Sequence, residues 1–178
     1  MEQVLDIGKA RVLWSEAIKG KGAICPCCDK FGKVYKQKIG SGNAGALIWM
    51  VRNTDPAKPW IDMRTQPPRW ITQKTTFTLL RWWGLIEGYV NVREIIDPET
   101  KEMEMRTTKN SGLWKVTPAG FDFVHRRIQV PKYVYLYNDT LQNVGTKTCT
   151  IDECLTEKFN YDRLMNDDNP QEFLNEYR

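Results

Sequence analysis

The chain has 178 residues, of which 41% are hydrophobic and 27% charged, values that suit one globular domain with an appendage. Its longest strongly apolar stretch, Ala46–Val51, is far shorter than the roughly 20 residues that cross a bilayer, so we expect no membrane partner. The five cysteines cannot all pair within one chain, and the first residues lack a secretory-signal pattern. We therefore expect a cytoplasmic protein with reduced thiols.

The net charge of +4 conceals an asymmetry along the chain. From Ile151 onward there are eight acidic residues and three basic ones, a net charge of −5, so the first 150 residues carry +9. A basic body with an acidic tail suits a protein that binds nucleic acid or meets an acidic partner. The alternative is a solvated tail that keeps a basic protein soluble.

Two helices are predicted in the first third of the chain. The first has apolar residues at helical spacing and is ended by Gly20; these residues are Ala10, Leu13, Trp14, Ala17 and Ile18. The second spans Ser41–Arg52 and ends before the stop signal Asn53-Thr-Asp-Pro56. Because it is apolar on most sides, we expect it to lie in the centre of the fold.

A cysteine cluster, Cys25-Pro-Cys27-Cys28, separates these helices. Its C-x-x-C spacing suits a metal knuckle, because the backbone N–H groups of a tight turn can point at thiolate sulfurs. One pair is half of a zinc site, and Cys149, Cys154 and the single histidine, His125, are candidates for the other half. We predict zinc bound by Cys25, Cys28, Cys149 and Cys154, with Cys27 as a substitute for Cys28. The alternatives are a turn with free thiols and, for His125, a packed position on the inner face of a helix.

The middle of the chain predicts a strand, a helix, a hairpin and a helix. Trp60–Met63 is a short strand, and a helix then runs from near Thr72 to Gly84, with Phe77, Leu80 and Trp83 on its inner face. Leu85–Asp97 and Glu102–Thr108 are strands joined by a turn. The last helix begins after the N-cap Thr117, with Pro118 at its first position, and ends before Pro131. Its predicted inner face is formed by Phe121, Val124, His125 and Ile128.

The C-terminal segment predicts a strand and a short helix. Tyr133–Tyr137 alternates strictly and places three tyrosines on one side of a strand. This stripe could pack on the N-terminal helix, bind a protein or stack on single-stranded nucleic acid. Thr150-Ile-Asp-Glu153 is a capping box that opens a helix before the acidic tail.

Two resemblances rest on particular segments. Leu-Arg-Trp-Trp-Gly84-Leu-Ile-Glu, a hairpin, and Leu-Trp-Lys-Val-Thr117-Pro-Ala-Gly-Phe resemble bacterial winged-helix regulators of the multiple-antibiotic-resistance and phenolic-acid types, over roughly Trp70–Arg127. The resemblance implies that the helix before Gly84 is a recognition helix. The cysteine segment and Val130-Pro-Lys-Tyr-Val-Tyr-Leu-Tyr-Asn138 are similar to uncharacterised phage and prophage proteins with a cysteine knuckle before a winged helix. That resemblance implies a phage setting.

The predicted recognition helix is basic and the hairpin after it is acidic. Between Met63 and Ile86 there are four basic residues and no acidic one, and cations with short polar groups are what a helix needs to contact phosphates and base edges. A second basic-aromatic stretch contains Lys33 and Lys36, and its alternative is a solvated strand face. The predicted nucleic-acid-binding residues are Arg64, Arg69, Lys74, Thr75, Thr78, Arg81, Trp82, Lys33 and Lys36. Between Glu87 and Arg106 there are six acidic and three basic residues. This net negative charge would be repelled by the phosphates, so it disfavours a hairpin that lies in a DNA minor groove.

These patterns together predict an α+β winged helix-turn-helix protein. We expect an N-terminal helix and knuckle over 1–40, a winged helix over 41–130, and a strand with an acidic helical tail, packed on that domain, over 131–178. The predicted function is regulatory DNA binding without enzymatic activity or a small-molecule substrate, since no phosphate-cradling loop or nucleophile motif is present. The alternative is a phage-type module that binds and inhibits or modifies a host protein complex.

Overall fold

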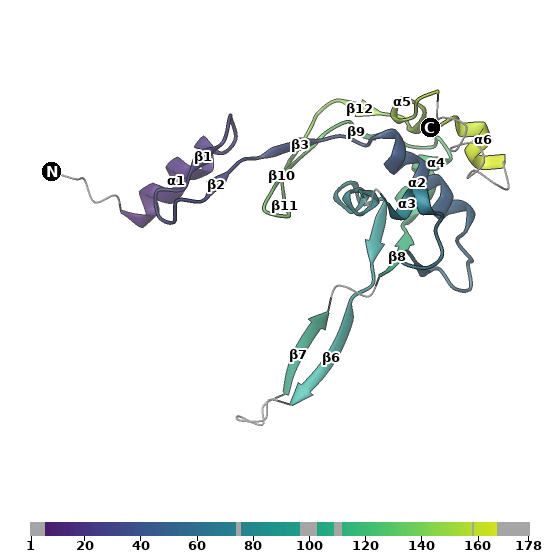
Figure 1. Cartoon of the computed structure of the whole chain (residues 1–178), viewed down its shortest axis with the longest axis horizontal. Coiled ribbons are helices and arrows are strands. Elements are labelled where there is room, and N and C mark those ends of the chain that lie inside the picture. Colours follow the sequence, from purple (N-terminus) through teal and green to yellow (C-terminus); the bar gives the residue numbers. More distant parts are fainter. Residues whose placement is uncertain (1–5, 74–75, 97–102, 109–111, 158, 167–178) are drawn as a thin grey trace. The chain divides into compact units, whose positions relative to one another are not determined.

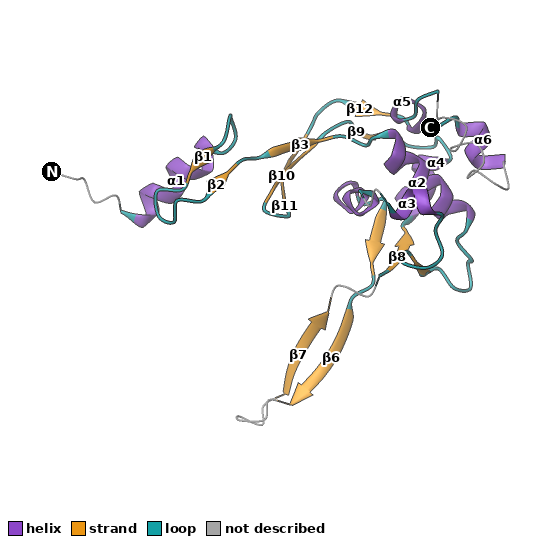
Figure 2. Ribbon diagram, in the orientation of Figure 1, coloured by secondary structure: helices purple, strands orange, loops and turns teal. Residues whose placement is uncertain are grey.

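The chain forms two compact units, each built from two separate stretches of sequence. The computed structural model describes residues 6–73, 76–96, 103–108, 112–157 and 159–166, with the backbone alone at 92–96 and 103–108. The N-terminal unit consists of Met1–Lys38 and Pro131–Thr148, and the central unit of Ile39–Val130 and Cys149–Arg178. Both combine helices with small antiparallel sheets, which confirms the α+β class (Figure 2). In the described ranges no helix has both the length and the apolar composition that a membrane span requires.

The described residues of the N-terminal unit form one helix, a small hairpin and a three-stranded sheet. Its elements are α1 (Ile7–Ala17), β1 (Ala23–Ile24), β2 (Phe31–Gly32), β3 (Tyr35–Gln37), β10 (Val134–Tyr137) and β11 (Thr140–Val144). β1 pairs with β2, and the sheet has the order β11-β10-β3 (Figure 1). In its register Gln37 lies opposite Val134 and Lys36 opposite Tyr135. The predicted tyrosine strand is thus confirmed as the middle strand of a sheet.

Helix α1 buries less of its apolar face than its spacing predicts. Ala10 and Ile18 are buried, whereas Leu13 is 61% exposed and Ala17 is also exposed. Trp14 is half-buried and lies close to Gly32, where a Cβ atom would come within 2.4 Å of its ring. The sheets of this unit are only two and three strands wide.

The central unit contains the remaining elements. They are α2 (Ser41–Arg52), β4 (Ile61–Asp62), α3 (Arg69–Thr72), the 3-10 helix η1 (Phe77–Trp83), β5 (Ile86–Gly88), β6 (Asn91–Ile96), β7 (Met103–Thr108), β8 (Leu113–Val116), α4 (Pro118–Val124), α5 (Ile151–Cys154) and α6 (Tyr161–Asn166). Two further short strands, β9 (Val130–Pro131) and β12 (Thr148–Cys149), pair with each other.

Helix α2 forms the centre of this unit, as its composition predicts. It has the predicted bounds Ser41–Arg52, buries residues on most of its sides, and contacts α4, α5, α6, η1 and β8 (Figure 1). Leu47 and Ile48 are completely buried. Asn43, the one buried polar side chain among the described residues, accepts a hydrogen bond from the Thr76 hydroxyl, which satisfies its buried oxygen.

A three-stranded sheet of order β4-β8-β5 packs against these helices. The predicted strand near Trp60–Met63 is confirmed as β4, and β8 pairs with it through Ile61–Trp114 and with β5 through Ile86–Val116. β6 and β7 form an antiparallel hairpin between β5 and β8, as predicted (Figure 2), but the strand predicted over Leu85–Asp97 is divided into β5 and β6.

The helix predicted from Thr72 to Gly84 is divided. α3 ends at Thr72, Thr76 precedes η1, and the second half is a 3-10 helix, so a continuous helix over this segment was wrong. The inner face was predicted well, since Phe77 and Leu80 are buried and Trp83 packs against the core. Gly84 ends η1 in the left-handed conformation (φ 69°), which a residue without a Cβ atom adopts at little cost.

Helix α4 begins as predicted but ends early. The Thr117 hydroxyl accepts a hydrogen bond from the Gly120 N–H at 3.0 Å and donates one to the Gly84 carbonyl at 2.6 Å. The helix ends at Val124, because the backbone reverses at Arg126, whose φ is +62°. The predicted inner-face positions of His125 and Ile128 were therefore wrong: both are exposed.

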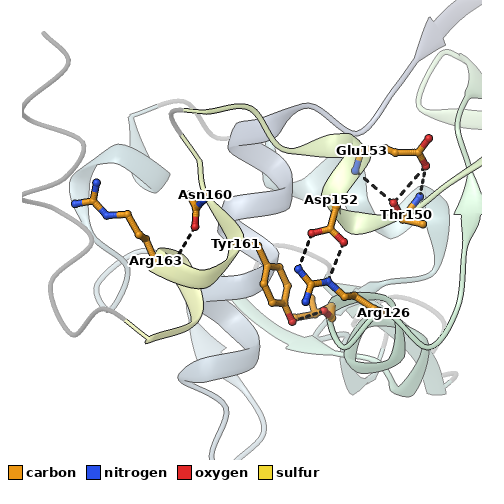
Figure 3. Close-up of polar contacts among 8 residues, drawn as sticks. Arg126, Thr150, Asp152, Glu153, Asn160, Tyr161 and Arg163 are labelled. Atoms are coloured by element: carbon orange, nitrogen blue, oxygen red, sulfur yellow. Dashed lines mark hydrogen bonds and ion pairs between the residues drawn. The ribbon is translucent and has the colours of Figure 1, made fainter.

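The segment after Cys149 packs on the same core. The predicted capping box is present: the Thr150 hydroxyl accepts from the Glu153 N–H at 3.3 Å, and the Glu153 carboxylate accepts from the Thr150 N–H at 2.8 Å (Figure 3). Ile151 and Leu164 are buried, so α5 and α6 are attached through apolar contacts. Beyond residue 166 the acidic tail lies outside the described residues.

Candidate nucleic-acid interface

The basic residues predicted to bind DNA lie around α3 and η1 of the central unit. Arg69, the first residue of α3, and Arg81 in η1 are exposed, and Thr78 is half-buried. Lys74 and Thr75 fall outside the described residues. No acidic residue occurs between Met63 and Ile86, so this segment carries only positive charges along the sequence.

The Trp82 ring supports Arg81, and its indole N–H is not accessible to a ligand. The Arg81 guanidinium lies 4.6 Å from the centroid of the Trp82 ring, a distance at which a cation is attracted to the ring face. The Trp82 indole N–H is buried and has no acceptor among the described residues. Trp82 can therefore orient the arginine, but it cannot donate to a ligand without moving.

The Arg64 side chain lies beside Gly112, the residue that precedes strand β8. Gly112 (φ 75°) is so close that a Cβ atom there would come within 2.3 Å of the Arg64 Nε. The Gly112 carbonyl accepts a hydrogen bond from the Met63 N–H at 2.9 Å, and the Arg64 N–H donates to the Asp62 carboxylate at 3.0 Å. These contacts hold Arg64 close to β4 rather than to α3, the element that carries Arg69.

An ion pair that no sequence pattern predicts lies at the base of the acidic hairpin. Glu87 and Lys115 lie opposite each other on β5 and β8, with Oε1 and Nζ 2.5 Å apart. The Lys115 ammonium also lies 4.8 Å from the Trp60 ring centroid, and Trp60 packs edge-on against Tyr89 with centroids 5.1 Å apart. The charge of Glu87 is thus matched by Lys115, which lies outside the Glu87–Arg106 segment in which six acids and three bases were counted. The register of β5 and β8 brings the two residues together.

Lys33 and Lys36, the other two predicted residues, lie in the N-terminal unit. Lys33 is half-buried and Lys36 is exposed. The Lys36 Nζ lies 3.8 Å from the centroid of the Tyr133 ring, on the neighbouring strand segment. The nine predicted residues are therefore divided between the two units.

The Cys25–Cys28 segment is the turn of the β1–β2 hairpin. The Cys25 N–H donates to the Lys30 carbonyl at 2.8 Å, the Asp29 N–H donates to the Cys25 carbonyl at 3.0 Å, and Asp29 has a φ of +56°. The Cys27 N–H, with a smaller contribution from Cys28, is directed at the Cys25 sulfur and lowers the pKa of that thiol. This turn can stabilise a thiolate, as a metal knuckle would require.

The other two predicted zinc ligands lie in the central unit. Cys149 and Cys154 are buried, with their sulfurs 3.7 Å apart. Among the described residues no three His, Cys, Asp or Glu side chains are grouped so that they could hold a metal ion. Zinc bound by Cys25, Cys28, Cys149 and Cys154 stays a prediction.

The predicted binding residues form two surfaces, each of which contains cations and aromatic rings. Arg69 and Arg81 belong to the central unit, and Lys36 and Tyr133 to the N-terminal unit. Both surfaces suit contacts to phosphate groups. Comparison of the chain with protein-family models, with curated proteins and with solved structures finds no match.

Proposed function

We propose that the central unit is a winged-helix domain and that the protein is a non-enzymatic, regulatory DNA-binding protein of the cytoplasm. The order of elements supports the domain assignment: α2, β4, α3, η1, then β5 and β8 with the β6–β7 hairpin between them. The sheet order β4-β8-β5 also suits it, because the hairpin strands must return beside the first short strand. The phage setting depends on the resemblance of the cysteine segment.

The observation that carries the DNA proposal is the acid-free segment Met63–Ile86 with Arg69 and Arg81 exposed. Phosphate contacts supply most of the affinity of such a surface, and each contact formed releases counterions. The Glu87–Lys115 pair, with its atoms 2.5 Å apart, weakens one objection to the proposal, because one hairpin acid is already matched by a cation.

The test is fluorescence anisotropy of a labelled mixed-sequence DNA duplex with the full-length protein at ~50 mM salt, where the electrostatic attraction is strong. We expect Arg69→Ala and Arg81→Ala each to weaken binding by about tenfold and to lower the slope of log affinity against log salt by about 0.9. Arg127→Ala is the matched control, because Arg127 is an exposed arginine of the same unit that pairs with Asp122 at 3.2 Å. The proposal is wrong if the wild-type protein does not bind the duplex, or if the control weakens binding equally.

A protein-binding module that acts on a host complex is the second candidate. It is favoured by three large apolar residues of α1 that are exposed: Ile7 (63%), Val12 (64%) and Leu13 (61%). Exposed apolar groups on one short helix are typical of an interaction surface. In nuclease-treated lysate the wild-type protein would then retain a stoichiometric partner that Leu13→Glu loses and Lys9→Glu, on the same helix, retains. If both variants behave like wild type, α1 does not bind that partner.

A further inference from the structure

One face of the sheet in the N-terminal unit carries tyrosines and lysine. Lys36 on β3 lies opposite Tyr135 on β10, so both side chains are on the same face. Tyr133 and Tyr137 are two residues from Tyr135 along the chain and share that face, because side chains alternate along a strand. We call Lys36, Tyr133, Tyr135 and Tyr137 the tyrosine face.

Along β10 the two faces differ in burial, although on the neighbouring strands Tyr35, Leu141 and Val144, which share the face of Val134 and Leu136, are 54%, 37% and 42% exposed. Val134 and Leu136, on the face opposite the tyrosines, are 1% and 8% exposed. The three tyrosines are half-buried, and Lys36 is exposed. Tyr137 lies near Gly32, where a Cβ atom would come within 3.1 Å of its ring, so this tyrosine packs partly on the unit itself. At the other end of the tyrosine face, the Lys36 Nζ lies 3.8 Å from the centroid of the Tyr133 ring.

Three further lysines lie in the segments next to Tyr133. Continuing the register by one residue places Lys38 opposite Tyr133. The segment before β10 stays paired with the segment after β11. The Gly145 N–H donates to the Tyr133 carbonyl at 2.9 Å, and the Lys132 N–H donates to the Lys147 carbonyl at 2.7 Å. Lys38, Lys132 and Lys147 are all exposed.

The charge of the whole unit agrees with this local pattern. Met1–Lys38 and Pro131–Thr148 contain ten basic and five acidic residues, a net charge of +5, so the rest of the chain carries −1. Within Lys30–Lys38 and Pro131–Thr148, the stretches that form the sheet, Asp139 is the one acidic residue. The net positive charge of the protein therefore belongs to the unit that bears the tyrosine face.

We propose that the tyrosine face binds single-stranded nucleic acid, with unpaired bases stacking on Tyr133 and Tyr135 and phosphates contacting Lys36 and Lys38. Aromatic rings on a sheet, flanked by cations, match the two requirements of a single strand, which are stacking surfaces and charge. A duplex would offer only phosphates here, because its bases are already stacked. The site is independent of the duplex-binding surface proposed for the central unit.

Two changes on this face and two matched controls test the proposal. Labelled single-stranded DNA and RNA of mixed sequence are titrated with the full-length protein at ~50 mM salt, beside the DNA duplex. We expect Tyr135→Leu and Lys36→Gln each to weaken single-strand binding by about fivefold or more, and Lys36→Gln to lower the salt slope by about 0.7. Tyr35→Leu, on the opposite face of β3, and Lys19→Gln, a lysine paired with Glu16, should stay within about twofold of wild type.

Other outcomes separate this site from the duplex site. Tyr135→Phe retains the ring and should bind like wild type, which keeps the test valid if Tyr135→Leu fails to fold. Arg81→Ala should weaken duplex binding and leave single-strand binding unchanged. Photo-crosslinking of an iodouracil-containing single strand to the wild-type protein should label the tryptic peptide Tyr133–Lys147. The proposal is overturned if the wild-type protein binds neither single strand, or if crosslinks fall only in the central unit; the comparison of DNA with RNA identifies the preferred strand.

Discussion

Arg126 and Asp152 form a bidentate ion pair, in which the arginine Nε donates to Oδ2 at 2.8 Å and Nη2 donates to Oδ1 at 2.7 Å (Figure 3). The same guanidinium lies 3.8 Å from the centroid of the Tyr161 ring, and the Tyr161 hydroxyl donates to the Val124 carbonyl at 2.8 Å. These contacts join the end of α4 to α5 and α6. They explain why Arg126 is held in a left-handed conformation that glycine or asparagine more often adopts.

We predict that this pair makes the stability of the central unit fall in acid. The hydrogen bond from Arg126 lowers the pKa of Asp152 below its ordinary value of 3.8. A carboxyl with a depressed folded-state pKa stabilises the fold above its unfolded pKa, and that contribution is lost as the pH falls through the folded pKa. Asp152→Asn should lower the melting temperature at pH 7 by about 1–3 °C, because both side chains are nearly half exposed, and should reduce the difference between pH 7 and pH 3. Thermal melts at both pH values measure this. An unchanged pH dependence would contradict it.

Gly120 and Gly42 should respond oppositely to replacement by alanine. A Cβ atom at Gly120 would come within 2.2 Å of the Leu85 carbonyl oxygen and 2.7 Å of a Val116 methyl group, so Gly120→Ala should cost about 2–3 kcal/mol. Gly42, in the first turn of α2, has nothing within 4 Å of that position, and Gly42→Ala should stabilise by about 0.5 kcal/mol through the unfolded state. Urea unfolding of both variants measures the difference. Equal effects would show that the close approach of α4 to Leu85 is absent.

The five thiols should divide into two classes of reactivity. Cys27 and Cys28 are exposed, Cys25 has a lowered pKa, and Cys149 and Cys154 are buried. With EDTA present, iodoacetamide should therefore modify the hairpin cysteines at least about tenfold faster than the buried pair, since thiolate and access both govern the rate. The reaction of Cys25 should extend to lower pH than that of an ordinary cysteine, because its pKa is lowered. Peptide mass spectrometry follows each site, and rapid modification of Cys149 in folded protein would contradict the burial.

Elemental analysis tests the zinc prediction. If Cys25, Cys28, Cys149 and Cys154 bind zinc together, purified protein should hold about one equivalent, and Cys25→Ser and Cys149→Ser should each remove it. Lys30→Ser is the control, since it changes the same hairpin without removing a sulfur. Less than about half an equivalent in the wild-type protein leaves no intact structural site.

Features determined by neighbouring residues were predictable from the sequence. Helix α2 has the bounds that Ser41 and the Asn53-Thr-Asp-Pro56 segment indicate, and the Thr150–Glu153 capping box follows from a four-residue pattern. The early end of α4 was missed because a non-glycine residue, Arg126, reverses the chain through contacts with Asp152 and Tyr161. No local pattern encodes a conformation that depends on partners tens of residues away.

In the candidate site, too, local features were predictable from the sequence and contacts between distant residues were not. The exposure of Arg69 and Arg81 agrees with the charge pattern, which is a local property. The Glu87–Lys115 pair and the Lys36–Tyr133 contact depend on strand register, so a count of charges along the chain could not identify them. The Arg81–Trp82 contact and the burial of the Trp82 N–H likewise depend on the fold, whereas the role of Trp82 in binding stays a prediction.

The pairing of β3 with β10 has a consequence for the order in which the protein forms during synthesis. Gln37 pairs with Val134, 97 positions later, and β10 is the only strand that β3 pairs with in the described parts of the chain. At roughly 5–20 residues per second, the first strand waits about 5–20 s for its partner. The central unit also needs residues from Cys149 onward, because Ile151 and Leu164 belong to its core. The N-terminal unit cannot be completed until Thr148 has been translated, and the central unit is completed later still, so a product truncated before β10 lacks part of both units.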